Sequence, residues 1–448
     1  MKKVVMHSEV ACIMAILAMV LAGSVLAAIT PEEAAQLGKN LTALGAEKAG
    51  NADGTIPEYT GGMRTPPAGY VSGSGKWPDP YADEKPLFSI DAQNVDKYAD
   101  KLPEGVKEAF KVFPDFRMDI YPTHRSFWVP KWVEENTIKS ATKARTSDNG
   151  LSLKDVRAAV PFPIPKTAEE VMWNHLVQYH GLHWSIDYSA YLVDRNGRKI
   201  DSADLSETWE YPYWDPSSNE FTGYRQLAIF NGPPRMVGEK LLVLESINPI
   251  EAPRKVWQYL PGQRRVKLAP EIAFDTLNLA CSGMMTYDET FLFNGSMELY
   301  NWKIVGKKEM YVPYNMYKSL ALKLPDWRGY FFDPSFYRFE LHRVWIIEAT
   351  LKEGKRHLYH KRLWYIDEDS WAALVATNWD ASGKLWRAQF DMPWFNYEDG
   401  GIHTNQGFIY DLIGHATFST TGGTIKYYKT RMPPSDLNPD SMAGSGVR

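Results

Sequence analysis

The spacing of apolar residues predicts a helical and irregular first part of the chain. A helix is expected to begin at Thr30, because Thr30-Pro31-Glu32-Glu33 combines an N-cap residue, a first-turn proline and a capping-box glutamate. Leu37, Leu41 and Leu44 give it an apolar stripe that ends at the glycines that follow. Residues 51–86, with six glycines and six prolines, predict a long irregular segment draped over a core.

Further helices are predicted before the pattern changes. One is expected around 94–112, interrupted near Pro103. A mixed, Pro-rich segment follows over 121–165. Thr167-Ala168-Glu169-Glu170 forms a second capping box, and the helix that it opens should stop near Gly181.

From residue 184 onward, alternation and turn residues predict strands. Trp184–Val193 is followed by a hairpin turn at Arg195-Asn196-Gly197-Arg198, and a meander is expected over 221–310. The clearest strands of a second meander are Phe339–Leu351, Arg356–Ile366, Trp371–Trp379 and Lys384–Asp391. The pattern predicts an α+β, mainly β fold: a large curved antiparallel sheet, an incomplete barrel, with a few helices on its concave face.

The two ends of the chain carry their own signals. Lys2 and Lys3 precede an apolar run over 11–28 that closes on Val25-Leu26-Ala27, the order of a secretory signal. We expect residues 1–27 to be a cleavable signal peptide and the mature protein to act outside the cytoplasm; an uncleaved membrane anchor is the alternative. The tail, 431–448, is rich in Pro, Ser and Gly and is expected to be disordered.

These predictions divide the mature chain into three parts. Residues 28–165 should form an N-terminal helical and irregular segment packed on the core. Residues 166–430 should form a helix plus the antiparallel half-barrel, and 431–448 the tail. Cleavage would leave Cys281 as the single cysteine, so the core rather than disulfides must hold the fold. The formal net charge of −4 argues against nucleic acid as a default partner.

Motifs of common enzymes, metal sites and cofactor sites are missing from the sequence, so we expect a non-enzymatic protein without cofactor or metal. His175, His180 and His183 cluster in the sequence; packing or capping is the favoured interpretation and a metal site the alternative. Asp367-Glu368-Asp369 is expected to be a solvated turn, and Cys281 a buried apolar residue.

Aromatic residues make up 13% of the chain, and they recur with methionines on the predicted strands. They are candidates for an apolar ligand cavity, or else form the core of a sheet covered on one side. The candidate ligand-binding residues are Trp257, Tyr259, Met284, Met285, Trp302, Trp345, Trp364, Trp379 and Trp386.

A second set of residues is locally basic in a chain whose net charge is negative. It is a candidate for receiving an anionic group or docking a partner, and a solvated hairpin end is an equal alternative. The set comprises Arg254, Lys255, Arg264, Arg265 and Lys267.

Four segments resemble a known family. Residues 256–266 read VWQYLPGQRRV, 363–367 read LWYID, 378–386 read NWDASGKLW, and 29–34 read ITPEEA. They are similar to a family of secreted proteobacterial proteins with a domain of unknown function in the LolA-like superfamily, often labelled outer-membrane lipoprotein-sorting proteins. The resemblance implies an incomplete antiparallel barrel whose concave face is plugged by helices, and relatives of this fold carry or sense lipid-like ligands.

Together these features suggest a periplasmic, non-enzymatic carrier or adaptor for a hydrophobic, lipid-like ligand, serving envelope lipid or lipoprotein transport. Envelope transport proteins are the expected partners. The alternatives are a structural adaptor of an inner-membrane exporter and outer-membrane complex, and an aromatic-lined glycan-binding protein.

Overall fold

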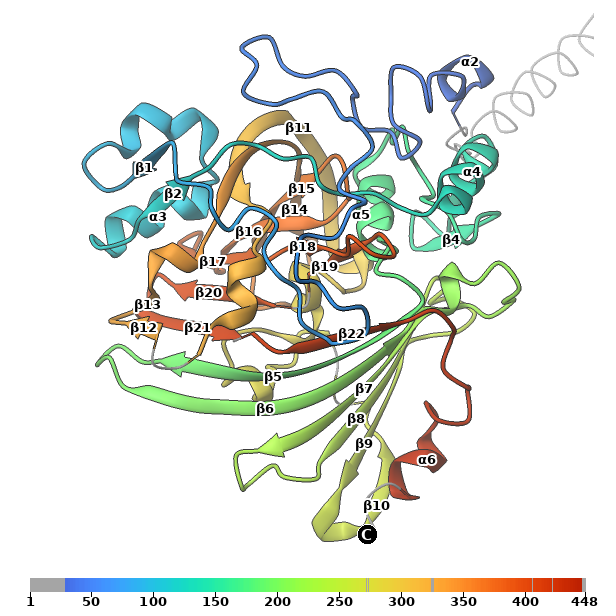
Figure 1. Ribbon diagram of the computed structural model, residues 1–448. Helices are drawn as coiled ribbons and strands as arrows, with labels where there is room; N and C mark the ends of the chain where they lie inside the picture. Colours follow the sequence, from blue (N-terminus) through green and yellow to red (C-terminus); the bar gives the residue numbers. More distant parts are fainter. Residues whose placement is uncertain are drawn as a thin grey trace, which may run out of the picture.

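The computed structural model describes residues 29–444 except 271, 273, 324, 325, 405 and 421, so the predicted signal peptide lies outside the described residues. One large sheet dominates this part of the chain (Figure 1). Its strands are β1 (Phe88–Ile90), β2 (Met118–Ile120), β5 (His183–Val193), β6 (Lys199–Glu210), β7 (Thr222–Gly232), β8 (Lys240–Ser246), β9 (Lys255–Leu260), β10 (Arg265–Leu268), β11 (Tyr300–Pro313), β14 (Phe339–Leu351), β15 (Lys361–Asp367), β16 (Ala373–Trp379), β17 (Leu385–Asp391), β20 (Gly407–Asp411), β21 (Ala416–Thr420) and β22 (Thr424–Tyr428).

The sheet is long, curved and open at both ends. Its strand order is β1-β2-β14-β15-β16-β17-β20-β21-β5-β6-β7-β8-β9-β10, with β11 beside β14 and β22 beside β5. Paired strands are antiparallel except β2 and β14, which run parallel where Ile120 meets Phe339. Within the described residues the two ends of this order do not pair, so the sheet is not closed into a barrel. The prediction of a mainly β fold with a few helices is confirmed.

The α-helices are few and short. They are α2 (Pro31–Ala34), α3 (Glu104–Val112), α4 (Lys131–Ser140), α5 (Ala168–Leu176) and α6 (Pro439–Gly444). Both capping boxes are confirmed, since the amides of Glu33 and Glu170 each donate to the preceding threonine hydroxyl at 3.2 Å. The helix at Thr30 nevertheless ends at Ala34 instead of continuing along its leucines.

Smaller elements complete the described part. Short two-stranded sheets pair β3 (Arg145–Ser147) with β4 (Ser152–Lys154), β12 (Trp327–Arg328) with β13 (Phe331–Phe332), and β18 (Trp394–Phe395) with β19 (Ile402–His403). The 3₁₀ turns include η1 (Val95–Lys101), η2 (Pro212–Trp214), η3 (Pro261–Gln263), η4 (Leu279–Cys281), η5 (Tyr287–Leu292), η6 (Met297–Leu299), η7 (Tyr317–Ala321) and η9 (Pro334–Phe336).

The meander predicted over 339–391 corresponds to β14–β17, although β15 begins at Lys361 rather than Arg356. The meander predicted over 221–310 is only partly present. It holds β7–β10 and the start of β11, but η4, η5 and η6 lie between β10 and β11, outside the sheet.

The two faces of the sheet are covered by different segments. The amide of Gly105 in α3 donates to the Thr377 hydroxyl, whereas Asn378, the next residue of β16, bonds Gln389, which donates to Glu289 of η5. Adjacent strand residues point to opposite faces, so α3 and η5 lie on opposite faces. Residues of β5–β7 and of β17, β20 and β21 surround one cavity with η5, which makes the η5 face the concave one. The 3₁₀ turn η5 therefore lies on the concave face together with α5, since Nε2 of His175 in α5 lies 3.0 Å from the carbonyl of Phe293, directly after η5.

A buried ion pair ties η5 to the sheet. Nη1 of Arg362 on β15 donates to Oδ2 of Asp288 at 2.7 Å, and Nε2 of His357 lies 3.2 Å from the same oxygen. Nε1 of Trp364 donates to the carbonyl of Leu292 at 3.0 Å. Burial by itself would raise the pKa of Asp288, but Arg362 and His357 bring that pKa below its ordinary value. Asp288 is therefore a buried anion that depends on its cation.

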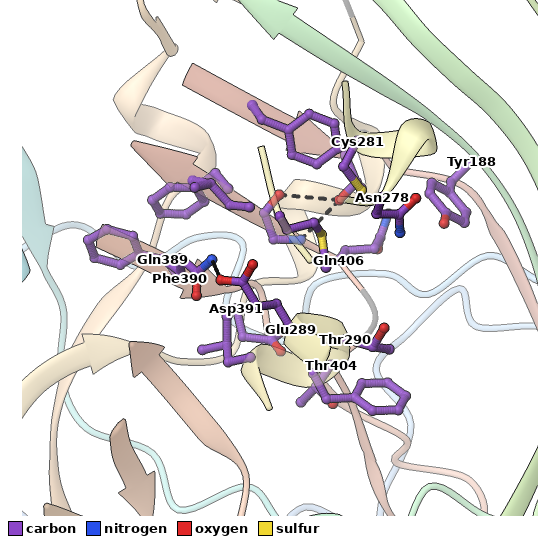
Figure 2. A pocket seen from close by; sticks show the side chains of 18 of the residues that line it. Tyr188, Asn278, Cys281, Glu289, Thr290, Gln389, Phe390, Asp391, Thr404 and Gln406 are labelled. Carbon is purple, nitrogen blue, oxygen red and sulfur yellow. Dashed lines mark hydrogen bonds between the residues drawn. The ribbon is translucent and has the colours of Figure 1, made fainter. Parts of the chain in front are cut away.

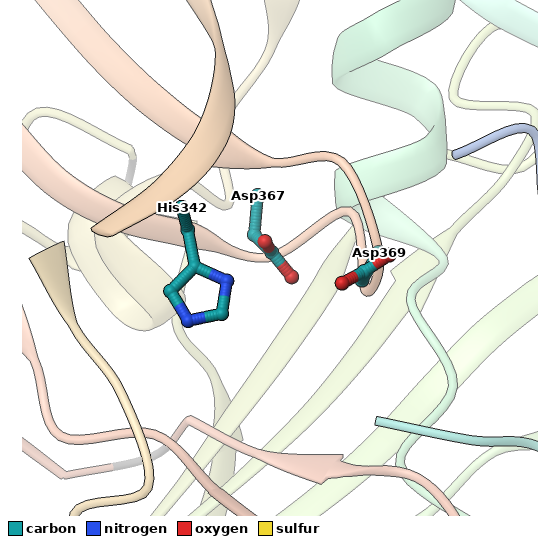
Figure 3. A group of neighbouring side chains, drawn as sticks. All are labelled: His342, Asp367 and Asp369. Carbon is teal, nitrogen blue, oxygen red and sulfur yellow. The ribbon is translucent and has the colours of Figure 1, made fainter. Parts of the chain in front are cut away.

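A second charged cluster anchors the N-terminal segment on the turn after β15. Figure 3 shows two acids of this turn, Asp367 and Asp369. Arg125 donates to both carboxylate oxygens of Asp369, at 2.9 and 2.6 Å, and also to the carbonyl of Glu47 at 2.8 Å. Glu368 pairs with Lys307 and Arg343. The prediction that residues 367–369 form a solvated turn is wrong, because cations from distant segments pair with these acids and bury them.

The C-terminal tail also differs from the prediction. Leu437 and Met442 are buried against Leu242 and Tyr259, and Lys240 donates to the carbonyl of Met442 at 2.8 Å. Residues 437–444 are thus packed on the outer face of β8–β10 instead of being disordered.

Removing the cation of the Asp288–Arg362 pair should destabilise the fold. Arg362→Met keeps much of the side-chain volume but leaves Asp288 buried without its partner. We expect the free energy of unfolding to fall by about 3–5 kcal/mol, measured by urea denaturation at pH 7. Lys131→Met removes a cation whose side chain is 84% exposed and should cost less than about 0.5 kcal/mol. Equal losses for the two variants would contradict the importance of the buried pair.

The free energy of unfolding should depend on pH through the protonation of Asp367. Burial, and then the charge of Asp369, raise the pKa of Asp367 to about 6. Between pH 4 and 6 the folded state therefore holds a proton that the unfolded state has lost. Asp367 thus stabilises the fold below about pH 4, and this contribution, up to about 3 kcal/mol, is lost as the pH rises to about 6.

Asp367→Asn cannot ionise, so its free energy of unfolding should rise relative to the wild type across that window and level off above it. Urea denaturation at pH 4, 5, 6 and 7 measures the difference. Asp83→Asn, at an exposed position, controls for removal of one charge. A difference between Asp367→Asn and the wild type that does not change with pH would refute the assignment.

Candidate functional site

A cavity of about 110 Å³, which we call the η5 cavity, lies between the concave face and η4–η5 (Figure 2). Gln389 points at Glu289, to which it donates, and Asp391 lies beside them. Burial raises the pKa of Asp391 well above its ordinary value, which favours the neutral form of this carboxyl. The cavity can hold a few water molecules, but it is far below the roughly 300–1,000 Å³ of small-molecule sites.

Cys281 borders the same cavity and is buried. Desolvation by burial raises the pKa of the Cys281 thiol, and the charges of Glu289 and Glu207 raise it further. The thiolate, which is the nucleophilic form, is therefore disfavoured at this position. The expectation that Cys281 is a buried apolar residue is confirmed.

A larger groove of about 290 Å³ lies where β7 begins and β8 ends, and we call it the β7–β8 groove. One wall comes from α5 and the other from residues 294–298, which follow η5. Its apolar lining includes Leu151, Trp173, Leu176, Val177, Ile250 and Met297. Ile250 is 58% exposed, so the rim of the groove presents an apolar side chain to solvent.

The β7–β8 groove also has a buried polar part. Glu245 and Arg254 face each other with Oε2 and Nε 3.5 Å apart, and their side chains are only 16% and 10% exposed. The Arg254 guanidinium lies over the Phe274 ring, 4.8 Å from its centre. Asn294 donates to the hydroxyl of Tyr224 beside them. Buried charge is thus concentrated in one part of the groove, whose lining also includes Ser246, Ser296 and the exposed Glu298.

The ion pair between Glu245 and Arg254 is poorly satisfied. Nε of Arg254 and Oε2 of Glu245 lie 3.5 Å apart and lack hydrogen-bond geometry. Neither these two atoms nor Nη1 of Arg254 has a hydrogen-bond partner among the described residues. Burial raises the pKa of Glu245, and Arg254 opposes that shift. Leaving such groups buried and unpaired is costly, which marks this part of the groove as able to take a polar ligand group.

The group with the best geometry for a metal ion is His342, Asp367 and Asp369, whose ligand atoms lie within 4.8 Å of one another (Figure 3). Both Asp369 oxygens already accept from Arg125, and Nε2 of His342 lies 3.1 Å from Glu340. A cation would have to compete with the Arg125 guanidinium for Asp369. These contacts identify an ion-pair network that anchors the fold.

The three clustered histidines serve packing. Nε2 of His175 lies 3.0 Å from the carbonyl of Phe293, and Nδ1 of His180 lies 2.8 Å from that of Ile402. His183 stacks on an aromatic ring of β22. Burial lowers the pKa of His175 to about 4 and that of His180 to about 3, so both rings are neutral at pH 7.

The nine aromatic and methionine candidates do not line one cavity. Met285 borders the η5 cavity, and none of the nine is among the described residues that line the β7–β8 groove. Trp302, Trp345 and Trp364 pack in the core on the concave face, and Met284 is buried near Cys281. Trp257 and Tyr259 lie on the outer face of β9 under α6, and Trp379 and Trp386 are half-buried on β16 and β17.

The basic candidates separate in a similar way. Arg254 lines the β7–β8 groove. Lys255, Arg264 and Arg265 are exposed, and Lys267 is half-buried on β10. The remaining groove residues were not predicted, although the Asn248-Pro249-Ile250 loop, an apolar turn directly after a strand, was a signal that could have found them.

Comparison with known proteins identifies related chains. Residues 89–443 match a family described as "Protein of unknown function (DUF1329)". An uncharacterized protein of Pseudomonas aeruginosa is 39% identical over 430 residues, which cover 92% of this chain and 90% of the relative. Three of the four segments that carried the resemblance, all but 29–34, lie inside the matched region.

Two solved structures are similar at low identity. A DUF1329 family protein of Desulfovibrio piger is 13% identical, with 59% of this chain and 92% of that chain covered and a TM-score of 0.42. A LolA superfamily protein of Nitrosomonas europaea is 11% identical, with 62% and 100% covered and a TM-score of 0.37. Among the described residues, no helix has the length and apolar character needed to cross a membrane. The family match and the Pseudomonas relative together establish that this chain belongs to the DUF1329 family of proteins of unknown function.

Proposed function

We propose that this protein is a non-enzymatic periplasmic carrier or adaptor that binds a hydrophobic, lipid-like ligand in the β7–β8 groove. The observation that carries the proposal is the apolar lining of this groove together with the exposed Ile250 at its rim. Its volume of about 290 Å³ lies at the lower end of the range of small-molecule sites and suits one chain better than several. The predicted signal peptide supports the periplasmic location.

The filled concave face supports the choice of this groove. The η5 cavity is less than half as large as the β7–β8 groove, and carboxyl and amide groups line much of it. An apolar chain placed there would contact these carboxyl and amide groups without offering them a hydrogen bond, which is unfavourable. No tryptophan is among the large apolar residues that are exposed in the described part of the chain. The alternative of a glycan-binding protein therefore has little support.

Ligand binding should depend on the rim of the groove. Ile250→Asp places a charge beside an apolar chain and removes its contact with isoleucine. We expect binding of a neutral fluorescent probe, N-phenyl-1-naphthylamine, to weaken by about 10-fold, since losing part of a buried isoleucine contact costs about 1.4 kcal/mol. Fluorescence titration of the mature, delipidated protein measures the affinity.

Val71→Asp is the matched control, because Val71 is 64% exposed and lies outside the groove. It should bind the probe as the wild type does. A wild-type protein that binds no apolar probe, or an Ile250→Asp variant with unchanged affinity, would refute the proposed function.

A further inference from the structure

We propose that the ligand of the β7–β8 groove is a single-chain amphiphile whose anionic end group, a carboxylate or a phosphate, is received by Arg254. This inference rests on the proposed function and adds the chemical class of the ligand. It is carried by the guanidinium of Arg254, which borders the groove, has a side chain nine-tenths buried, and leaves two N–H groups without acceptors among the described residues.

The surroundings of Arg254 hold its guanidinium in place without satisfying it. Phe274 lies against one face at 4.8 Å, a cation–π contact that fixes the plane of the group. Glu245 is the acid paired with it, and the 3.5 Å separation is too long for a charge-assisted hydrogen bond. An anionic group that enters the groove can therefore supply acceptors that the protein does not.

The distribution of polarity in the groove fits an amphiphile better than a hydrocarbon. Arg254 lies beside Tyr224 and Asn294, which are almost fully buried, whereas Ile250 at the rim is exposed. A ligand with its charge at the buried part can lay its chain along Leu176 and Val177 toward the rim. A neutral chain of the same length would offer no acceptor to these N–H groups, so it would gain no hydrogen bond from Arg254.

Glu245 makes the site selective. Its carboxylate competes with a ligand anion for Arg254 and repels it, so only a ligand that can form direct hydrogen bonds to the guanidinium gains from the charge. The side chain of Glu245 otherwise accepts from the amide of Ser246 at 3.1 Å, which its amide analogue can also do through the side-chain carbonyl. Replacing Glu245 with Gln therefore removes the competing charge with little structural change.

The test is competition against N-phenyl-1-naphthylamine by decanoate, decyl phosphate and decanol, each below its micellar concentration. The wild type should bind at least one of the two anions about 10-fold more tightly than decanol. Decanoate and decyl phosphate distinguish which anionic group is preferred. Arg254→Gln should lose this preference while binding decanol within about 2-fold of the wild type, and Arg264→Gln, at an exposed arginine outside the groove, should keep it.

Glu245→Gln keeps the inference testable if Arg254→Gln does not fold, because it should bind the anions about 3-fold or more tightly than the wild type. Equal binding of decanol and both anions by the wild type, or unchanged or weaker anion binding by Glu245→Gln, would overturn the inference and leave the proposed function intact. Failure of decanol and both anions to displace the probe would overturn the proposed function and the inference with it.

Discussion

The arrangement of this molecule depends on a charge pair buried inside a curved sheet. Removing Asp288 and Arg362 from water costs several kcal/mol for each ion, and their attraction offsets this only when other groups complete the geometry. His357 and the carbonyl of Leu292 provide those groups at the concave face. The pair therefore holds η5 in one position against β15, and the interior of the half-barrel is closed around it.

Filling the interior determines where an apolar ligand can still be placed. Asn294 and Met297 follow η5 in the chain and form one wall of the β7–β8 groove. The segment that Asp288 holds in place thus covers the concave face, and the residues that follow it form part of the β7–β8 groove. The aromatic-lined cavity that the composition suggested is absent among the described residues of the concave face, and the groove at the start of β7 and the end of β8 is the apolar site that remains.

The sequence predicted those parts of the fold that depend on local patterns. Alternation located β14–β17, and the capping boxes located the starts of α2 and α5. Burial of Asp369 was not predictable, because it depends on Arg125, which lies 244 residues away in the sequence. The packing of α6 and the position of η4, η5 and η6 outside the sheet likewise depend on surfaces that exist only after folding.

The candidate site shows the same limit at the level of single residues. Arg254 and Lys255 are adjacent in the sequence, but only Arg254 lines the groove, while Lys255 is exposed. A basic run cannot reveal which of its members lies against Phe274 and opposite Glu245. That contact decides the chemistry, since a buried cation with unpaired N–H groups favours an anion and an exposed one pairs with water. On the proposed function, the ligand would enter the groove with its charge first, and its chain would extend toward Ile250 at the surface.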